Sequence, residues 1–193
     1  MNIQAIVFPF DVFGSAGTAA GAQLLGDALE EMLDDAHAEK QPARAESYRE
    51  LLTLEEIEFE TLDALHTWRE SGKELVEKVL AEENFLLWLG GNHLSVLPVY
   101  EALPKDTLVI QFDAHLDVYN LSDCTTELSH GNFLLHATSL PKVVNLGSRD
   151  LFLPTAHTEK FFRQVFTAED FALDVTEVVE QVQKLAKKAK RIW

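Results

Sequence analysis

The chain has 193 residues, enough for one domain with a core, and its 47% hydrophobic and 25% charged residues are ordinary for a soluble globular protein. Its formal net charge of −16 disfavours binding to nucleic acid or anionic membranes and is compatible with a small cationic substrate. The simpler interpretation, which we prefer, is that the acids lie on solvated helix faces, as at Glu55, Glu56, Glu58 and Glu60. No apolar run is long enough for a membrane span, no signal sequence is present, and a single cysteine, Cys124, fits a reducing, cytoplasmic location.

Apolar runs and helical periodicity predict the elements of the first half. The run 3–9 ends in proline and predicts a strand, and the glycines that follow it mark a loop whose spacing does not match a dinucleotide-binding fingerprint. Hydrophobic residues near helical spacing predict helices over 24–38 and 61–80, and 46–52 is expected to add another. Gly72 interrupts the helix over 61–80, which leaves open whether it is one helix or two.

The second half alternates between continuous apolar runs and helical stretches. The runs cover 85–89, 108–112 and 143–146, and the helical stretches cover 94–103, 131–138 and 175–189. Continuous apolar runs are typical of strands buried on both faces, so we expect a mostly parallel α/β sheet with helices on both sides. The last residues, 191–193, are expected to open a further strand, which suggests a fragment of a longer protein; a short ordered tail is the alternative.

The segment Asp113-Ala-His115-Leu-Asp117 carries the strongest chemical signal. If it continues the strand over 108–112, its two carboxylates and its imidazole point to one side at the carboxyl end of a buried strand. Ligands bind at that edge of open α/β sheets, and this donor set suits Mn²⁺, Zn²⁺ or iron. An acidic surface turn is the alternative.

Two further histidines follow predicted elements in a similar way. His93 comes after the run 85–89 and the turn at Gly90-Gly91, so it is expected at the same sheet edge. His130 follows a polar loop and opens a predicted helix, where it could shuttle protons or simply begin the helix.

These motifs resemble those of the arginase/agmatinase/formiminoglutamase (ureohydrolase) family, in order and over nearly the whole chain. The resemblance rests on these segments: Gly90-Gly-Asn-His-Leu-Ser95, Phe112-Asp-Ala-His-Leu-Asp117, Ser129-His-Gly131, Phe8-Pro-Phe-Asp11 and Val144-Asn-Leu-Gly-Ser-Arg149. It implies a three-layer α/β/α fold with a mostly parallel sheet, forming a single domain over 1–193 whose C-terminal strands are missing from this chain.

The resemblance also implies a hydrolase with two manganese ions. His93 and Asp117 would bind one ion, His115 would bind the other, Asp113 would bridge them, and His130 would be the proton shuttle. A hydroxide bridging the two ions would attack a linear amidine or guanidino compound and break a C–N bond, as in agmatinases. The complete enzyme is expected to form a homo-oligomer. Substrate-binding residues are not identified by the motifs.

The sequence departs from the family at several positions. Asn92 replaces an aspartate beside the metal histidine, and the family's second metal motif, Asp-x-Asp, is absent from residues 1–193. Tyr119 and Phe152 stand where arginases carry substrate-binding residues, which argues against arginine itself. The alternatives are therefore a formiminoglutamase-type activity and a non-catalytic protein or inactive fragment. An unrelated metallohydrolase such as a phosphatase is disfavoured, because no basic cluster accompanies the ligands.

Overall fold

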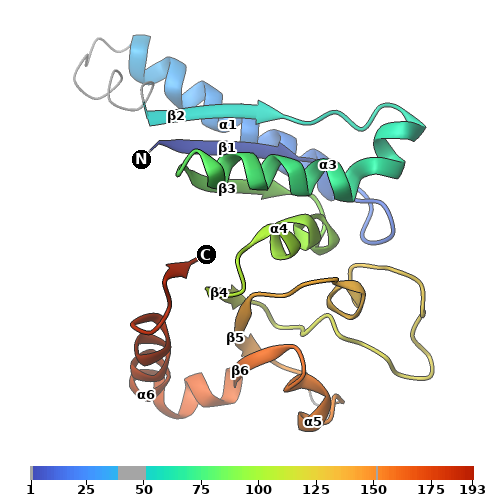
Figure 1. The fold of residues 1–193 in the computed structure, drawn as a ribbon, viewed down its shortest axis with the longest axis vertical. Coiled ribbons are helices and arrows are strands. Elements are labelled where there is room, and N and C mark those ends of the chain that lie inside the picture. Colours follow the sequence, from blue (N-terminus) through green and yellow to red (C-terminus); the bar gives the residue numbers. More distant parts are fainter. Residues whose placement is uncertain (1, 39–50, 151) are drawn as a thin grey trace. The chain divides into compact units, whose positions relative to one another are not determined.

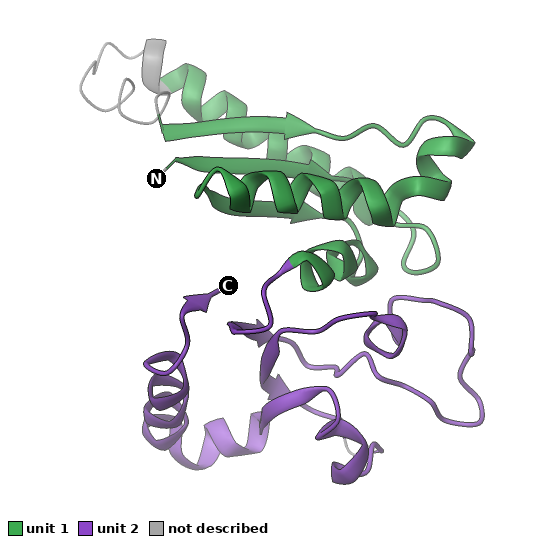
Figure 2. Ribbon diagram, in the orientation of Figure 1, with its two compact units in different colours: residues 1–102 green, residues 103–193 purple. Residues whose placement is uncertain are grey.

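The structure of the chain is a computed structural model that describes residues 2–38, 51–150 and 152–193. It divides into two compact units, residues 1–102 and residues 103–193 (Figure 2). The helix expected over 46–52 lies mostly outside the described residues, and Leu52 begins a strand.

The first unit is a three-stranded parallel sheet in the order β2-β1-β3, covered by helices (Figure 1). Its elements are β1 (Ile3–Phe8), α1 (Thr18–Ala38), β2 (Leu52–Glu56), α3 (Leu62–Ala81), β3 (Phe85–Gly90), the 3₁₀ helix η1 (His93–Val96) and α4 (Leu97–Ala102). A Cβ atom added to Gly26 of α1 would meet Val7, whereas one added to Gly72 of α3 would meet Phe8. Because neighbouring side chains of a strand point to opposite faces, α1 and α3 cover opposite faces of this sheet.

The second unit is a four-stranded parallel sheet in the order β6-β5-β4-β7. Its elements are β4 (Thr107–Phe112), the 3₁₀ helix η2 (Phe133–His136), β5 (Lys142–Ser148), α5 (Thr155–Thr158), β6 (Phe162–Thr167), α6 (Ala168–Ala186) and β7 (Arg191–Ile192). Val178 of α6 packs with Leu108, Val144, Leu146 and Phe166 of the strands in the core of this unit.

The strand expected at the end of the chain is confirmed. β7 pairs in parallel with β4, and the backbone of Trp193 continues the ladder by donating to Leu108 O and accepting from Ile110 N, both at 2.9 Å. The predicted fold class is also confirmed, since the strands form parallel sheets and helices cover them in an α/β/α arrangement. Among the described residues, no helix is both long and apolar enough to cross a membrane.

Several predicted boundaries were wrong. The helix expected over 131–138 is only the short η2, and the one expected over 94–103 consists of η1 followed by α4. The last helix begins at Ala168, and its backbone leaves the helical region at Asp174. Glu55 and Glu56 lie on β2 and not on a helix face, because the segment after residue 51 is an edge strand.

Gly72 does not divide α3, which runs without a break from Leu62 to Ala81. A Cβ atom at Gly72 would lie 2.9 Å from Pro98 Cβ and 3.1 Å from Phe8 Cζ, closer than packed atoms normally approach. The glycine is therefore a packing residue that lets α3 approach both α4 and the sheet.

We expect opposite effects from the same substitution at two helical glycines. Gly72→Ala should destabilise the protein by about 1–3 kcal/mol, because the added methyl group overpacks the contact with Pro98 and Phe8. Gly21→Ala in α1 should stabilise it by about 0.5–1 kcal/mol, because nothing lies within 4 Å of the added atom and alanine favours the helix. Urea unfolding of the two variants and the parent measures both changes, and a shift of the same sign in both variants would contradict the packing role.

Candidate metal centre

The segment from Asp113 to Asp117 is a loop at the carboxyl end of β4, which stops at Phe112. Residues at the end of β5 hold this loop by three hydrogen bonds. They are Asp113 N to Leu146 O at 3.1 Å, Arg149 N to Ala114 O at 2.9 Å and Asn145 Nδ2 to His115 O at 3.4 Å. The two central strands of the sheet therefore fix the loop that carries the predicted metal ligands.

Backbone geometry brings the two carboxylates of this loop together. Asp117 has a φ of +50°, a left-handed conformation that Asp and Asn adopt more readily than most residues. Its side chain is buried, and one of its carboxylate oxygens lies within 4.8 Å of one from Asp113. The expected alternation along an extended strand was wrong, because the chain turns after Phe112. Two carboxylates this close repel each other unless a cation or a proton lies nearby, so the pair favours a metal site.

Asp113 also organises the space next to it. Its carboxylate accepts hydrogen bonds from His115 N at 3.0 Å and from Gln111 Nε2 at 3.3 Å. The Nδ1 atom of His115 lies 3.7 Å from Asp113 Oδ1, and the histidine side chain is 67% exposed. An imidazole in this position can turn toward or away from the carboxylates, since few atoms surround it.

His93 belongs to the first unit, where it is half-buried directly after the end of β3. The glycine turn before it lies against the segment after β1: a Cβ atom at Gly91 would be 2.3 Å from Phe10 O. Asn92 caps η1 by accepting from Leu94 N at 3.0 Å, and its Nδ2 donates to Val12 O at 3.4 Å. A carboxylate at position 92 could accept the first bond but could not donate the second, so the asparagine suits this loop.

His130 is exposed in a turn that precedes η2, and so it does not open a regular helix. Its loop is organised by Asn132, which is only 2% exposed. The Asn132 side chain accepts from Ser129 N at 2.8 Å and donates to Thr125 O at 3.0 Å and Glu127 O at 2.8 Å. Asn132 lies two residues after His130 in the sequence. Only the structure shows that its side chain forms hydrogen bonds to three residues of this loop.

Removing the Asn132 side chain should therefore loosen the loop that carries His130. Asn132→Ala leaves one buried donor and two acceptors without their partner, so we expect a loss of about 2–4 kcal/mol in unfolding free energy, at about 1–3 kcal/mol for each unmet group with partial access to water. Asn120→Ala, at an exposed position of the same loop, is the matched control and should change little. Equal urea midpoints for the two variants would show that Asn132 does not hold the loop.

Two neighbouring residues complete this region. His157 of α5 places Nε2 2.8 Å from Val118 O, and its ring meets Phe161 edge-on. Tyr119 donates its backbone N–H to Gly131 O at 3.2 Å, which joins the Asp117 loop to the His130 loop. Burial, helped by the nearby carboxylate of Asp150, raises the pKa of the Tyr119 phenol well above its usual range. No pattern in the sequence singles out His157, because its contact joins distant segments.

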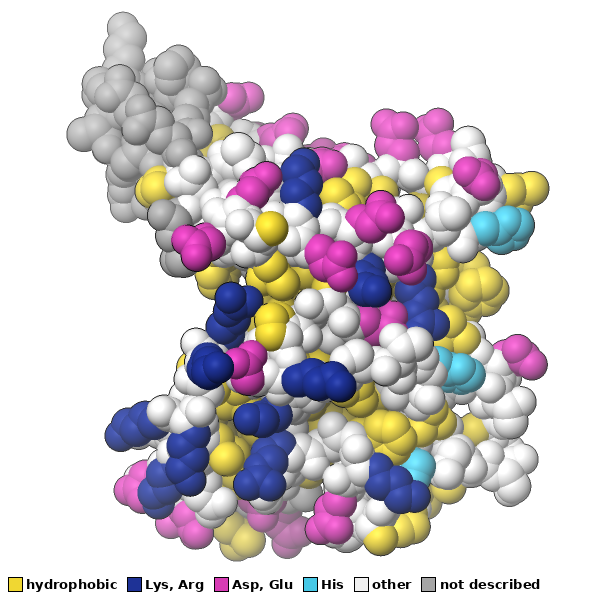
Figure 3. All heavy atoms as spheres, viewed as in Figure 1, with side chains coloured by type: hydrophobic (Ala, Val, Ile, Leu, Met, Phe, Trp, Pro, Cys, Tyr) yellow, Lys and Arg dark blue, Asp and Glu magenta, His cyan; other side chains and the backbone are white. Residues whose placement is uncertain are grey.

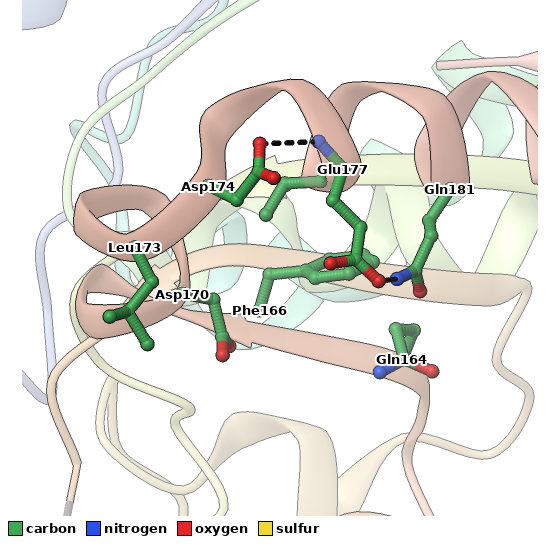
Figure 4. Close-up of a pocket in the computed structure, with 8 residues that line it drawn as sticks. Gln164, Phe166, Asp170, Leu173, Asp174, Glu177 and Gln181 are labelled. Atoms are coloured by element: carbon green, nitrogen blue, oxygen red, sulfur yellow. Dashed lines mark hydrogen bonds between the residues drawn. The ribbon is translucent and has the colours of Figure 1, made fainter.

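A cavity of about 240 Å³ beside α6 contains three acids, but two of them have structural roles (Figure 4). Asp170 forms a capping box with Thr167 at the start of α6. Asp174 accepts from the backbone N–H groups of Thr176 and Glu177, both at 3.0 Å, and so restarts the helix after its irregular residue. These acids stabilise helix ends, and the cavity is not the expected metal centre.

Comparison of the sequence with models of known protein families identifies the family to which this chain belongs. The sequence model of the arginase family matches residues 2–193. This chain belongs to the arginase family. The predicted family is thus confirmed. Two curated relatives are agmatinases, from Bacillus cereus and Bacillus anthracis, each 36% identical over 77 residues. The match covers 38% of this chain and 24% of each agmatinase, so it spans about a quarter of their length.

Solved structures of the arginase family share the fold of the whole chain. An arginase from Bacillus subtilis has a TM-score of 0.72 at 20% identity. The alignment covers 100% of this chain and 72% of the arginase chain. The agmatine ureohydrolase of Thermoplasma volcanium has a TM-score of 0.69 at 17% identity, covering 100% of this chain and 65% of its own. A Trypanosoma cruzi formiminoglutamase variant with Mn²⁺ has a TM-score of 0.67 at 23% identity, covering 99% of this chain and 67% of its own.

Proposed function

We propose that this chain contributes metal ligands to an enzyme that hydrolyses a C–N bond in a linear amidine or guanidino compound. The observation that carries the proposal is the pair of neighbouring carboxylates, Asp113 and Asp117, at the carboxyl end of a parallel strand in a member of the arginase family. Residues 1–193 would form a single catalytic domain with the remaining part of the family fold.

The donor set fits a divalent metal. Asp113 and Asp117 would supply oxygens, and His115 would supply an imidazole nitrogen beside Asp113. We propose His93 as a further ligand on the ground of its motif alone, Gly90-Gly-Asn-His93. A mixture rich in carboxylates favours Mn²⁺, and two ions are expected in the complete enzyme. Such ions, when bound, acidify water and polarise the substrate.

The protein's own groups would orient the substrate and move the proton. His130, on the loop fixed by Asn132, is exposed and so can reach a departing amine as a general acid. Tyr119 keeps its proton at neutral pH and can donate a hydrogen bond without adding charge. His157 would keep the Asp117 loop in place through Val118.

An agmatine-like substrate fits these residues better than arginine. The curated relatives are agmatinases, and neither Tyr119 nor Phe152 offers the acid or amide with which arginases hold the amino acid group. The net charge of −16 also favours a cation. Formiminoglutamate is the second candidate, because a formiminoglutamase shares the fold at 23% identity.

The test combines metal binding with product analysis. Electron paramagnetic resonance follows Mn²⁺ binding to the chain and to Asp113→Asn, and product assays follow urea from agmatine and arginine and formamide from formiminoglutamate. For residues 1–193 alone we expect weak Mn²⁺ binding that Asp113→Asn weakens further and little or no product, because the second metal motif is absent from these residues. We expect urea from agmatine when the remaining part of the family fold is present. Unchanged binding in the variant contradicts the metal centre, and no product from any of the three compounds with the complete fold contradicts the activity.

The role of His130 has its own expected result. In the complete enzyme, His130→Ala should lower kcat by about 10²–10⁴-fold, as for other general acids, and leave bound Mn²⁺ nearly unchanged. His66→Ala, at an exposed histidine of α3, is the matched control and should change neither quantity. Metal analysis beside kinetics measures both, and loss of metal in step with activity would instead make His130 a ligand or a structural residue.

A further inference from the structure

A second cavity opens at the amino edge of the sheet of the second unit, the edge opposite to Asp113. Its volume is about 320 Å³. Its lining comes from the starts of three parallel strands and from the end of α6: Leu108, Lys142, Arg163, Leu185, Lys188 and Ala189. Half of these residues are exposed cations and half are apolar.

The cations of this cavity lack the partners that neighbouring cations have. Lys184 lies 3.8 Å from Glu180, and Lys190 lies 3.1 Å from Asp106. In the part of the chain that the structure describes, no ion pair involves the cavity residues Lys142, Arg163 and Lys188. Three positive charges around one space repel each other, and an anion placed among them would relieve that repulsion.

Charges are also distributed unevenly along the chain. Residues 142–191 hold nine of the 16 lysines and arginines and only seven of the 32 acids, although the whole chain has a net charge of −16. Figure 3 shows Lys and Arg side chains gathered around hydrophobic ones over the second unit, with Asp and Glu prominent over the first. Cations at the end of α6 suit the helix dipole, but Lys142 and Arg163 come from β5 and β6 and have no such role.

The apolar side of the cavity belongs to the core of the unit. Leu108 is only 2% exposed, and Leu185 and Ala189 pack against the cluster around it. A neighbouring cavity of about 420 Å³ shares Lys142 and Arg163 and adds Lys160, with Glu159 as its acid. A ligand that extends from the first cavity thus meets a fourth cation and a single carboxylate.

We propose that this cavity binds a small organic anion with a doubly charged head, such as a phosphate monoester or a dicarboxylate, and an apolar body. The head would lie among Lys142, Arg163 and Lys188, where Arg163 can make paired hydrogen bonds to its oxygens. The apolar body would lie against Leu108 and Leu185. This site is separate from the proposed metal centre and does not depend on the proposed function.

The test uses phenyl phosphate as the probe and the full chain. Amide NMR titration should give saturable shifts at the starts of β4, β5 and β6, with none around Asp113. The double variant Lys142→Gln/Arg163→Gln should weaken binding at least about tenfold, because it removes two of three charges from the site. The matched double variant Lys184→Gln/Lys190→Gln removes the same charge from outside the cavity and should weaken binding less than about twofold.

Two further probes identify what is recognised. Phthalate, a dicarboxylate with a ring, should bind as well if double charge decides, and binding of phenyl phosphate alone would assign the site to phosphate. Inorganic phosphate should bind more weakly than phenyl phosphate, because it lacks the apolar body. The absence of saturable shifts, or equal weakening by both double variants, would overturn the proposal, since general charge attraction would then explain any effect.

Discussion

Replacing Asp117 by asparagine is expected to weaken Mn²⁺ binding at least about 100-fold, because we propose Asp117 as a charged ligand and not merely as a neighbour of one. Asparagine keeps the size of the side chain and tolerates the left-handed backbone, whose φ is +50° at this residue. The fold should therefore persist, and without metal the variant should be no less stable, since one of two adjacent carboxylates loses its charge.

Asp123→Asn is the matched control, because Asp123 is an exposed residue of the loop that follows. Calorimetric titration with Mn²⁺ and urea unfolding without metal measure the two effects. Asp117→Ala adds a third comparison, with an expected loss of about 1–2 kcal/mol from the left-handed backbone. If Asp117→Asn binds Mn²⁺ as tightly as the control does, the carboxylate pair is not a metal site.

Gly91→Ala is expected to have the largest effect on stability, a loss of at least about 3 kcal/mol. The added methyl carbon would lie 2.3 Å from Phe10 O and 2.7 Å from Phe10 C, and backbone atoms cannot move aside as a flexible side chain can. Relief of this overlap requires the turn before η1 to separate from the segment after β1. Asn92 and His93 would then shift together, so the variant should also bind Mn²⁺ more weakly.

Gly131→Ala is the control for this substitution, because the added atom would be 3.6 Å from the Tyr119 ring, an ordinary contact. Urea unfolding should show nearly unchanged stability for Gly131→Ala and a much lower midpoint for Gly91→Ala. Similar midpoints would mean that the turn at Gly91 yields at little cost and does not fix the position of His93.

The sequence predicts the central strands well because burial dominates their composition. β1, β4 and β5 are apolar runs with a neighbour on both sides, and β3 is an apolar run although it pairs only with β1. The missed strands, β2 and β6, are both edge strands. Their sequences, Leu-Thr-Leu-Glu-Glu and Phe-Arg-Gln-Val-Phe-Thr, mix polar and apolar residues because solvent reaches part of the strand.

In the candidate site, too, some features could be predicted from the sequence and others could not. The types and order of the candidate ligands can be predicted from the sequence, since carboxylates and imidazoles after strand ends are suited to binding metals. The approach of Asp113 and Asp117 depends on one left-handed residue, and a strand-like alternation gave the wrong reason for it. Contacts such as His157 with Val118 join residues 39 positions apart, and no local pattern encodes them. The roles of His93, Asp113, His115, Asp117 and His130 remain predictions.

The two hydrogen bonds of Asn92 have an evolutionary consequence. Asparagine and aspartate differ by a single-nucleotide change, yet here the amide donates to Val12 O while its oxygen caps η1. Aspartate at position 92 would place a buried carboxylate against a carbonyl oxygen, so we expect it to cost stability unless the loop following β1 changes as well. The substitution is thus epistatic with that loop, and mutational paths toward the aspartate of other family members should pass through residues near Val12 first.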